Sequence, residues 1–447
     1  MGKLFGTDGI RGIVGEDLTH ELALKVGEAS AYVLGEEFDN ITVLIGRDTR
    51  ISGQMLASAI ASGLMSQGAN VIDLGIIPTP AVSYLVKKYG ATMGVMISAS
   101  HNPSEYNGIK LFNSEGFKLP DETEFEIEKY LLGKAVPSTT KVGTLSTCDT
   151  GVEDYVNYVA ETSKSINENL KIVVDCAYGS ASVTAPPLFE KLNLKPTIIN
   201  YKFDGYNIND KAGSTHLEGL IERVKELGAD IGIAYDGDAD RCLMVDEHGE
   251  LVDGDKIMAI SSLYLKENNK LSNDTLVGTV MSNLGLVKFC EQNGIHYEAT
   301  KVGDRYVLEK MLECNYNIGG EQSGHIIFKD FANTGDGELT SIQILNIVTE
   351  KDNKLSELAK VMTTYPQVLI NVKVREEGKQ KYENDSEISK QIKSVEKELN
   401  GDGRVLIRPS GTESLIRVMI EGINQDEINE MAKSIADIIE EKYGLKN

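Results

Sequence analysis

Three aspartates stand at alternate positions in one short loop, Asp236, Asp238 and Asp240, and Arg241 follows them. Three carboxylates this close repel one another unless a cation lies between them, and hard oxygen ligands suit Mg²⁺ or Ca²⁺. An EF-hand is excluded because Arg241 takes the place of its glycine and because the flanking runs are strand-like rather than helical. The loop therefore predicts a metal site with positions open for a phosphate oxygen. The alternative is a solvated acidic turn.

A serine follows a second strand-like run. The apolar segment 92–97 ends abruptly in the sequence SASHNP, which contains Ser100 and His101, and Pro103 stops the strand from continuing. Side chains at the carboxyl end of a strand are where α/β folds place their chemistry. His101 is adjacent to Ser100 and is poorly placed as a triad base, and no GxSxG elbow is present. Ser100 is therefore either a nucleophile or part of a polar loop that caps a helix.

Two further loops carry polar groups between glycines. Residues 319–325 read GGEQSGH, and a carboxylate, an amide and a hydroxyl together suit the hydroxyl groups of a sugar. Residues 408–414 read RPSGTES, and Arg417 follows. Two guanidinium groups, several hydroxyls and a glycine make a phosphate cradle plausible. The alternatives are an ordinary glycine-rich turn in the first loop and a surface charge at Arg417.

The elements that must position these loops follow a repeated pattern. Segments 42–74, 171–199 and 276–297 each read as a strand, a turn rich in Gly or Ser, a helix and a second strand. We interpret them as three similar α/β domains in tandem, with mixed sheets covered by helices. Chance similarity among βαβ units is the alternative. The stretch 134–150 has little periodicity and predicts a linker.

The end of the chain has a different pattern, which predicts a smaller α+β domain. A helix is expected over 385–399, a strand pair around 404–417 and a closing amphipathic helix over 425–443. The predicted domains are 1–150 with the serine loop, 151–253 with the metal-binding loop, 254–367 with the sugar-binding loop and 368–447 with the phosphate-binding loop.

Bulk composition limits the partners and the compartment. The 447 residues are enough for about two to four domains. A net charge of −23 argues against nucleic acid and anionic membranes as partners. No run of about 18 uncharged apolar residues and no secretory signal is present. Five cysteines without a CxxC pair fit a reducing cytoplasm, so we expect a cytoplasmic protein.

The four loops together, in this order, resemble the four signatures of the α-D-phosphohexomutase superfamily. The opening segment 5–12, FGTDGIRG, is also similar to that superfamily. Segments 207–216 and 302–307 resemble its branch that acts on glucosamine phosphates. Two positions depart from the pattern, since Ala212 stands where cysteine is usual and Ser414 where proline is common. Neither departure removes a catalytic group.

The resemblance implies a fold and an activity. The expected fold is three related α/β domains and a smaller C-terminal domain, heart-shaped around a central cleft to which each domain contributes one loop. The expected enzyme is an intramolecular phosphotransferase of the isomerase class, which interconverts glucosamine 6-phosphate and glucosamine 1-phosphate for UDP-N-acetylglucosamine and cell-wall precursor synthesis. The alternative within the superfamily is a phosphomannomutase or phosphoglucomutase with the same mechanism.

The resemblance also implies residue roles. Ser100 is expected to be a phosphoserine and, with the three aspartates, a ligand of one Mg²⁺ per chain. Cationic groups beside it are expected from Arg11, Lys110 and Arg241. Either Lys110 or His325 is expected to exchange the proton. The sugar hydroxyls are assigned to Glu321 and Ser323, and the phosphate that does not react is assigned to Arg408, Ser410, Gly411, Thr412 and Arg417.

The same resemblance implies the partners of the enzyme. A bisphosphorylated hexosamine is expected as intermediate and activator, a phosphosugar as substrate, and a monomer or homodimer as the assembly. Because the sugar must present each end in turn, a mobile fourth domain is expected. Two other functions stay open. A phosphatase would pass the phosphoryl group to water, and a sugar-phosphate sensor would bind without catalysis.

Overall fold

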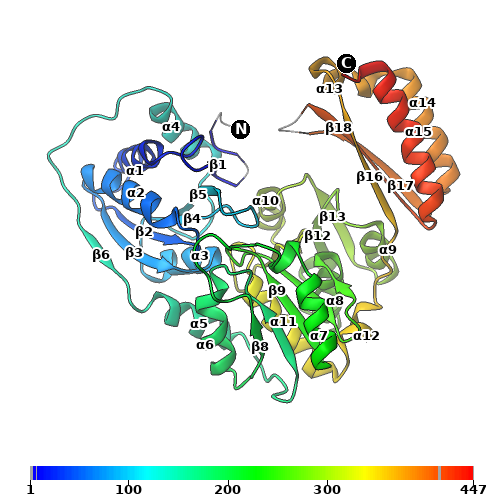
Figure 1. Cartoon of the computed structure of the whole chain (residues 1–447), viewed down its shortest axis with the longest axis horizontal. Helices are drawn as coiled ribbons and strands as arrows, with labels where there is room; N and C mark the ends of the chain where they lie inside the picture. The colour runs from blue at the N-terminus through cyan, green and yellow to red at the C-terminus, as the bar shows by residue number, and fades with distance from the viewer. Residues whose placement is uncertain (1–3, 7, 411–413, 446–447) are drawn as a thin grey trace. The chain divides into compact units, whose positions relative to one another are not determined.

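The computed structural model describes residues 4–6, 8–410 and 414–445, which form four sheets and their covering helices (Figure 1). The chain divides into two compact units. The first comprises residues 1–281 and 293–361, and the second comprises residues 282–292 and 362–447. Each unit has its own sheets and its own core, and each is described by itself.

The first sheet carries the serine loop. Its six strands lie in the order β1-β5-β4-β2-β3-β6, with bounds Ile10–Ile13, Tyr106–Asn113, Met93–Ile97, Thr42–Arg47, Asn70–Ile76 and Leu145–Thr147. Its covering helices are α1 (His20–Leu34), α2 (Gly53–Ser66), α3 (Thr79–Lys88) and α4 (Asp121–Leu131). Helix α3 packs closely on one face of the sheet, because Gly46 and Gly94 have no side chain on that face. A Cβ on Gly46 would lie 2.5 Å from Val82, and a Cβ on Gly94 would lie 2.5 Å from Val86. Helices α1, α2 and α4 share a core with the other face.

One strand of this sheet was not expected. Strand β6 lies inside the predicted linker 134–150 and pairs in parallel with β3. All three of its residues are exposed. A strand that pairs through its backbone at a sheet edge, without burying side chains, leaves no alternating apolar pattern in the sequence.

The next two sheets carry the aspartate loop and the GEQSGH loop. The second sheet has the order β11-β10-β9-β7-β8, with bounds Leu251–Val252, Cys242–Asp246, Ile231–Tyr235, Ile172–Asp175 and Thr197–Ile199. The third has the order β13-β12-β14-β15, with bounds His296–Thr300, Thr275–Thr279, Ile318–Gly320 and Ile326–Phe328. Their helices are α5 (Gly151–Glu161), α6 (Ala181–Lys191), α7 (Glu218–Leu227), α8 (Gly254–Glu267), α10 (Asp304–Cys314), α11 (Gly337–Lys351) and α12 (Leu355–Ala359).

The three predicted strand–helix–strand repeats are confirmed. Each supplies a parallel pair to its sheet: β2 with β3, β7 with β8, and β12 with β13. The aspartate and GEQSGH loops both connect antiparallel neighbours, β9 to β10 and β14 to β15. Each loop therefore begins where a buried strand ends, which is the place that the sequence pattern predicted for chemistry.

The second unit covers residues 368–447, where a smaller α+β domain was predicted, together with residues 282–292 and 362–367. Strands β16 (Gln367–Lys373), β18 (Leu415–Gly422) and β17 (Gly403–Pro409) form an antiparallel sheet. Its helices are α9 (Leu284–Gln292), α13 (Glu376–Lys381), α14 (Ser386–Leu399) and α15 (Gln425–Tyr443). Buried Glu421 ties α9 to this sheet, because its Oε2 accepts a 3.0 Å hydrogen bond from the Leu284 amide.

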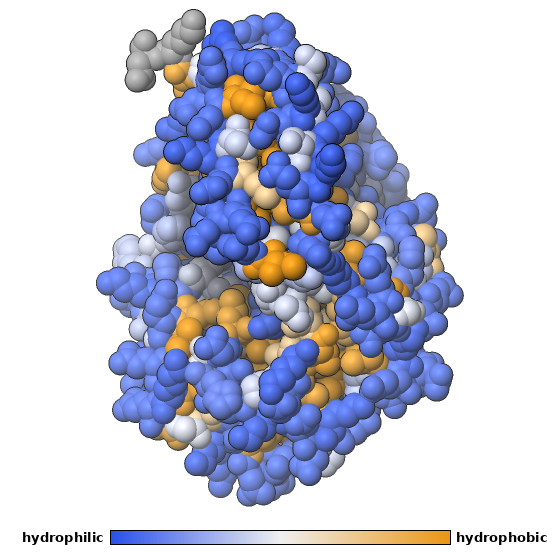
Figure 2. All heavy atoms as spheres, turned by 90° about the vertical axis from the view of Figure 1, so that its right-hand side faces the viewer, coloured by the Kyte–Doolittle hydropathy of each residue, from blue (hydrophilic) through white to orange (hydrophobic). Residues whose placement is uncertain are grey.

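The exposed face shown in Figure 2 is mainly hydrophilic, with apolar residues between the charged ones. Among the described helices, none combines the length and the apolar character that a membrane span requires.

Candidate active site

Ser100 lies in a strained turn directly after β4. Its φ angle is +54°, a left-handed value that is uncommon for a residue with a side chain, and its exposure is 1%. The Ser100 amide donates to Ser98 Oγ at 2.9 Å, and the Ser100 hydroxyl donates to Asp236 Oδ2 at 2.5 Å. His101 Nδ1 lies 3.4 Å from the same hydroxyl. Strain held in place by such contacts is typical of functional turns.

Arg50 fixes the shape of this turn. Its fully buried guanidinium donates to four backbone carbonyls of the serine loop: Ser100, Asn102, Pro103 and Tyr106. Asp48 orients it by accepting from Arg50 Nε at 2.9 Å, and Asp48 also accepts from the Ser98 hydroxyl at 2.6 Å. No sequence motif pointed to Arg50. Its position could have indicated a role, because Arg50 follows the end of β2 and β2 is the neighbour of β4, the strand that leads to Ser100.

We expect Arg50→Lys to lower kcat by about 10- to 100-fold, because lysine keeps the charge but not the fork that holds four carbonyls. The free energy of unfolding should fall by about 2–4 kcal/mol as buried carbonyls lose their donors. Steady-state kinetics and denaturant unfolding measure both effects. Arg223→Lys, on an exposed helix position, is the matched control and should change neither. Wild-type kinetics for Arg50→Lys would contradict this role.

The three aspartates meet beneath Ser100. Asp236, Asp238 and Asp240 are buried, and candidate ligand atoms of the three lie within 4.8 Å of one another. The Oδ1 atoms of Asp238 and Asp240 are buried and lack a hydrogen-bond partner. Burial and the neighbouring charges of Asp240 and Asp238 raise the pKa of Asp236 well above its usual value. Buried acceptors without donors are costly, so this group fits a divalent cation with oxygen ligands.

Close backbone contact brings the serine loop to the aspartate loop. A Cβ on Gly237 would lie 2.5 Å from the carbonyl oxygen of Ser100, so only glycine fits between Asp236 and Asp238. Asn209 Nδ2 donates to the same carbonyl at 2.9 Å. The structure therefore brings Ser100 and all three aspartates together in one site.

Lys110 is the buried cation of this site. Its Nζ lies 2.8 Å from Asp238 Oδ2, 3.4 Å from Asp240 Oδ2 and 3.2 Å from Asp8 Oδ2. Burial alone would lower the pKa of Lys110, but the carboxylates of Asp238 and Asp8 hold it well above its usual value. Thr79 also donates its hydroxyl to Asp238 at 2.6 Å. Lys110 thus offsets part of the negative charge of the aspartate loop.

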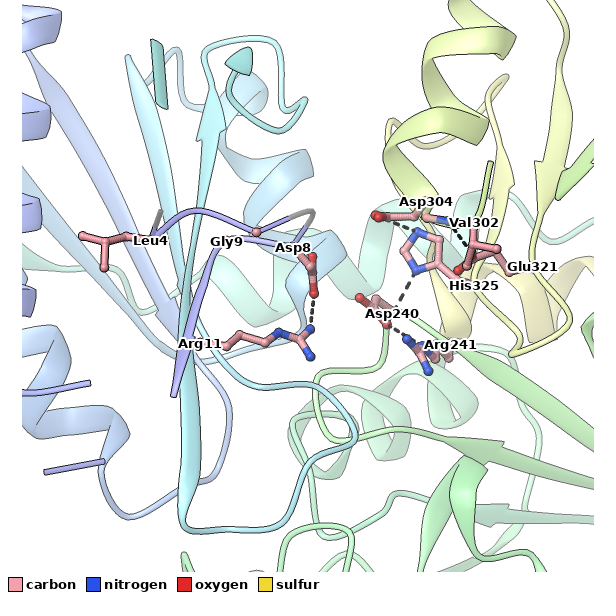
Figure 3. A pocket seen from close by; sticks show the side chains of 12 residues that line it. Leu4, Asp8, Gly9, Arg11, Asp240, Arg241, Val302, Asp304, Glu321 and His325 are labelled. Carbon is pink, nitrogen blue, oxygen red and sulfur yellow. Dashed lines mark hydrogen bonds and ion pairs between the residues drawn. The ribbon is translucent and has the colours of Figure 1, made fainter. Parts of the chain in front are cut away.

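A cavity of about 430 Å³ opens beside these groups. It is lined by Leu4, Gly6, Asp8, Gly9, Arg11, Asp240, Arg241, Val302, Gly303, Asp304, Glu321 and His325. Figure 3 shows Arg11 paired with Asp8 on one side, and Arg241, His325 and Glu321 on the other. Its size suits a phosphorylated sugar, and its lining mixes carboxylates with cations.

His325 and Arg241 both contact Asp240 in this cavity. His325 Nδ1 lies 3.7 Å from Asp240 Oδ1, and its Nε2 lies 3.6 Å from Asp304 Oδ2. Burial would lower the pKa of His325, but Asp240 and Asp304 raise it above its usual value. Arg241 Nε lies 3.8 Å from Asp240 Oδ1. His325 and Lys110 therefore both lie in the site, on different elements. Because the carboxylates around Lys110 keep it protonated, the structure favours His325 as the group that accepts a proton.

The GEQSGH loop contributes the polar groups expected to bind a sugar. Glu321 lines the cavity and accepts a 3.1 Å hydrogen bond from the Gly303 amide. Ser323 is not among the lining residues, and its buried Oγ has no hydrogen-bond partner. The loop packs tightly, since a Cβ on Gly324 would lie 2.5 Å from the Cys242 carbonyl.

Two arginines of the second unit lie on the same face of its antiparallel sheet. Arg408 on β17 and Arg417 on β18 are cross-strand partners, and both are half-buried. Burial and the charge of Arg417 lower the pKa of Arg408. Like charges opposite one another destabilise a sheet, and an anion bound between two guanidinium groups would offset that cost. Ser410 is buried at the end of β17, whereas Gly411 and Thr412 lie outside the described residues.

Comparison with known proteins assigns the family. Models of the phosphoglucomutase/phosphomannomutase family match over residues 2–135 (α/β/α domain I), 153–249 (domain II), 253–365 (domain III) and 369–438 (C-terminal domain). The phosphoglucosamine mutase of Alkaliphilus oremlandii is 52% identical over 447 residues, which cover 99% of this chain and 100% of that protein. The chain belongs to the phosphoglucosamine mutase family. The predicted superfamily, fold class and enzyme class are therefore confirmed.

Solved structures agree in fold. A phosphoglucomutase/phosphomannomutase family protein from Burkholderia thailandensis superposes with a TM-score of 0.84 at 23% identity, covering 99% of this chain and 98% of that one. The N-acetylphosphoglucosamine mutase of Aspergillus fumigatus, solved with GlcNAc-6P and magnesium, has a TM-score of 0.69 at 18% identity, covering 98% and 95%.

Several residues of the site had no predicted role. Asp8 and Asp304 line the cavity, Thr79 holds Asp238, and Arg50 shapes the serine loop. Asp8 had a detectable signal, an acidic residue three positions before Arg11. Asp304 lies in the segment 302–307, which the sequence analysis had singled out without giving it a role. Thr79 and Arg50 act through partners far away in the sequence, which no local pattern shows.

Proposed function

We propose that this enzyme interconverts glucosamine 6-phosphate and glucosamine 1-phosphate, with a phosphorylated Ser100 as the phosphoryl donor. The observation that carries the proposal is the 2.5 Å contact between Ser100 Oγ and Asp236, inside a cluster of three buried carboxylates. A nucleophile and a cation site in one strained, enclosed turn suit phosphoryl transfer, which needs positioning and charge neutralisation above all.

The reaction has two matching halves. A free hydroxyl of the sugar attacks the phosphorus of phospho-Ser100, the bond from phosphorus to Ser100 Oγ breaks, and the hydroxyl proton goes to His325 in its neutral form, because Lys110 is already protonated. Ser100 Oγ then attacks the phosphorus of the other phosphoryl group of the bisphosphorylated sugar, the bond from that phosphorus to the sugar oxygen breaks, and the proton returns to that oxygen. Arg11, Lys110 and Arg241 stabilise negative charge on the transferring group. Glu321, which lines the cavity, holds sugar hydroxyls, and the buried Oγ of Ser323, which has no hydrogen-bond partner, is assigned to them as well.

The proposed metal is one Mg²⁺ per chain, held by Asp236, Asp238, Asp240 and an oxygen of the phosphoserine. When bound, it would neutralise charge on the phosphoryl group. The Oδ1 atom of Asp238, which is buried without a hydrogen-bond partner, supports it. Magnesium in the Aspergillus relative is consistent with the same choice.

The phosphate that does not react is assigned to the loop of the second unit. Arg408 and Arg417 would bind it together with Ser410, Gly411 and Thr412. The in-register arginine pair supports this assignment, because bidentate guanidinium groups recognise phosphate with high specificity.

We expect Arg408→Gln to raise the KM for glucosamine 6-phosphate by about tenfold or more, with a smaller change in kcat, because a ground-state phosphate contact is lost. Initial-rate kinetics at saturating Mg²⁺ measure it. Lys373→Gln, an exposed position on the neighbouring strand β16, is the control and should leave KM unchanged. An unaltered KM for Arg408→Gln would remove this arginine from the substrate site.

We also propose an activator, an assembly state and a compartment for the enzyme. A bisphosphorylated hexosamine would act as activator and intermediate, the assembly would be a monomer or homodimer, and the compartment would be the cytoplasm. The five cysteines without a CxxC pair support a cytoplasmic enzyme, and the net charge of −23 argues against nucleic-acid and membrane partners. The product would feed UDP-N-acetylglucosamine and cell-wall precursor synthesis.

A mutase assay tests the substrate. The 6-phosphates of glucosamine, glucose and mannose are offered separately with Mg²⁺ and a bisphosphorylated sugar. We expect kcat/KM for glucosamine 6-phosphate to exceed the others by about tenfold or more. A preference for glucose or mannose 6-phosphate would leave the mechanism but refute the substrate, and release of inorganic phosphate without isomer would favour a phosphatase.

A further inference from the structure

Lys118 is a largely buried cation without a role in the mechanism above. It lies in the hairpin that follows β5, where it forms an isolated bridge with Phe112, and its side chain is only 12% exposed. Its Nζ lies 2.6 Å from Asp8 Oδ1 and 2.5 Å from Asp304 Oδ2. One ammonium group therefore joins carboxylates that are 296 positions apart in the sequence (304 − 8).

Each of these carboxylates also touches a proposed catalytic group. Asp8 pairs with Arg11 and lies 3.2 Å from Lys110 Nζ, whereas Asp304 Oδ2 lies 3.6 Å from His325 Nε2. Both carboxylates line the cavity, and Figure 3 shows Asp8 with Arg11 facing Asp304 with His325 across it. Lys118 thus connects the two sides of the cavity through their acidic residues.

The positive charge of Lys118 balances part of the negative charge of Asp8 and Asp304. Without Lys118, the carboxylate of Asp304 would keep His325 as its cationic partner among the described residues, and Asp8 would rely on Arg11 and Lys110. Each carboxylate would then draw the catalytic cation toward itself. A displacement of about 1 Å in such a group costs about 100-fold in rate.

A second contact nearby anchors the same segments independently of Lys118. Arg305, next to Asp304 at the start of α10, donates to the Leu119 carbonyl at 3.1 Å and to Glu124 Oε2 at 3.0 Å. Arg305 also pairs with Asp121. Because this anchor holds the backbone, the loss of the Lys118 charge should affect the cavity groups more than the fold.

We propose that Lys118 is a positioning residue of the mutase, which holds the Asp8–Arg11 side and the Asp304–His325 side of the cavity in register for phosphoryl transfer. This inference rests on the proposed function. Lys118 acts through the two carboxylates and need not touch the sugar.

Two charge-removing variants test it. Lys118→Met keeps the length of the side chain, and Lys118→Gln keeps N–H donors for the carboxylates. In both we expect kcat to fall by about 10- to 100-fold while KM changes by less than about threefold, with near-native circular dichroism and melting temperature. Lys129→Met, an exposed position on α4, is the control and should match the wild type. A kcat within about twofold of the wild type, or unfolding of both variants, would overturn the inference.

Chemical rescue separates positioning from a structural role. A cavity of about 110 Å³ lies beside Lys118 and is lined in part by Asp121, Asp304 and Arg305, so a small amine can reach the vacated place. In Lys118→Ala, added ethylammonium should restore at least about a tenth of the lost kcat without changing the melting temperature. No rescue in a folded variant would count against the inference. Failure of the wild type to convert glucosamine 6-phosphate would instead refute the proposed function.

Discussion

Ser100→Ala is expected to lower kcat for conversion of glucosamine 6-phosphate by about 10⁴-fold or more, because the group that carries the phosphoryl between the two ends of the sugar is lost. The hydroxyl is small and its contact is to Asp236 alone among the aspartates, so the fold should persist. Coupled-assay kinetics measure the loss, and circular dichroism with thermal unfolding verifies the fold.

The matched control is Ser104→Ala, four positions further along the same loop and outside the aspartate cluster, which should retain activity within about twofold. If Ser100→Ala kept more than about a tenth of the wild-type kcat, Ser100 could not be the obligatory phosphoryl carrier.

The second large effect is expected from the aspartate loop. Asp238→Asn should lower kcat by about 10³-fold and weaken Mg²⁺ binding, because a buried ligand loses its charge and its amide group brings N–H donors toward Lys110 and Thr79. Removal of divalent cations by a chelator should abolish wild-type activity, and added Mg²⁺ should restore it. Titration calorimetry with Mg²⁺ measures binding without relying on turnover.

Asp149→Asn changes an exposed acidic residue and serves as the control, with unaltered affinity for Mg²⁺. Full activity of the wild type after chelation, together with intact activity of Asp238→Asn, would show that the loop is an acidic turn balanced by Lys110 rather than a metal site.

The elements that hold the site could be predicted because their signals are local. Helix α15 was expected over 425–443 and is found there, because Asn424 caps its first turn and its buried residues recur at helical spacing: Ile428, Ala432, Ile435, Ala436 and Ile439. Strands β4 and β9 are fully buried runs that end in polar loops, so Ser100 and Asp236 were placed correctly at strand ends.

The support around these residues could not be predicted, for a physical reason. Arg50 reaches carbonyls at least 50 positions away, and Lys118 reaches Asp304 at a separation of 186. In a single sequence, a buried arginine or lysine looks the same as a solvated one, because its burial depends on partners that only the fold brings near. The requirement for glycine at position 237 could not be predicted either. It arises because the carbonyl of Ser100, which belongs to another domain, leaves no room for a Cβ.

The phosphoserine mechanism is tested most directly by quantitative phosphopeptide mass spectrometry of the enzyme during a single turnover. We predict that the active protein carries one phosphoryl group on Ser100, and that mixing with glucosamine 6-phosphate removes it as an equal amount of bisphosphorylated sugar appears. An enzyme that interconverts the two glucosamine phosphates while Ser100 stays unmodified, or that carries its phosphoryl group on another residue, would contradict the account.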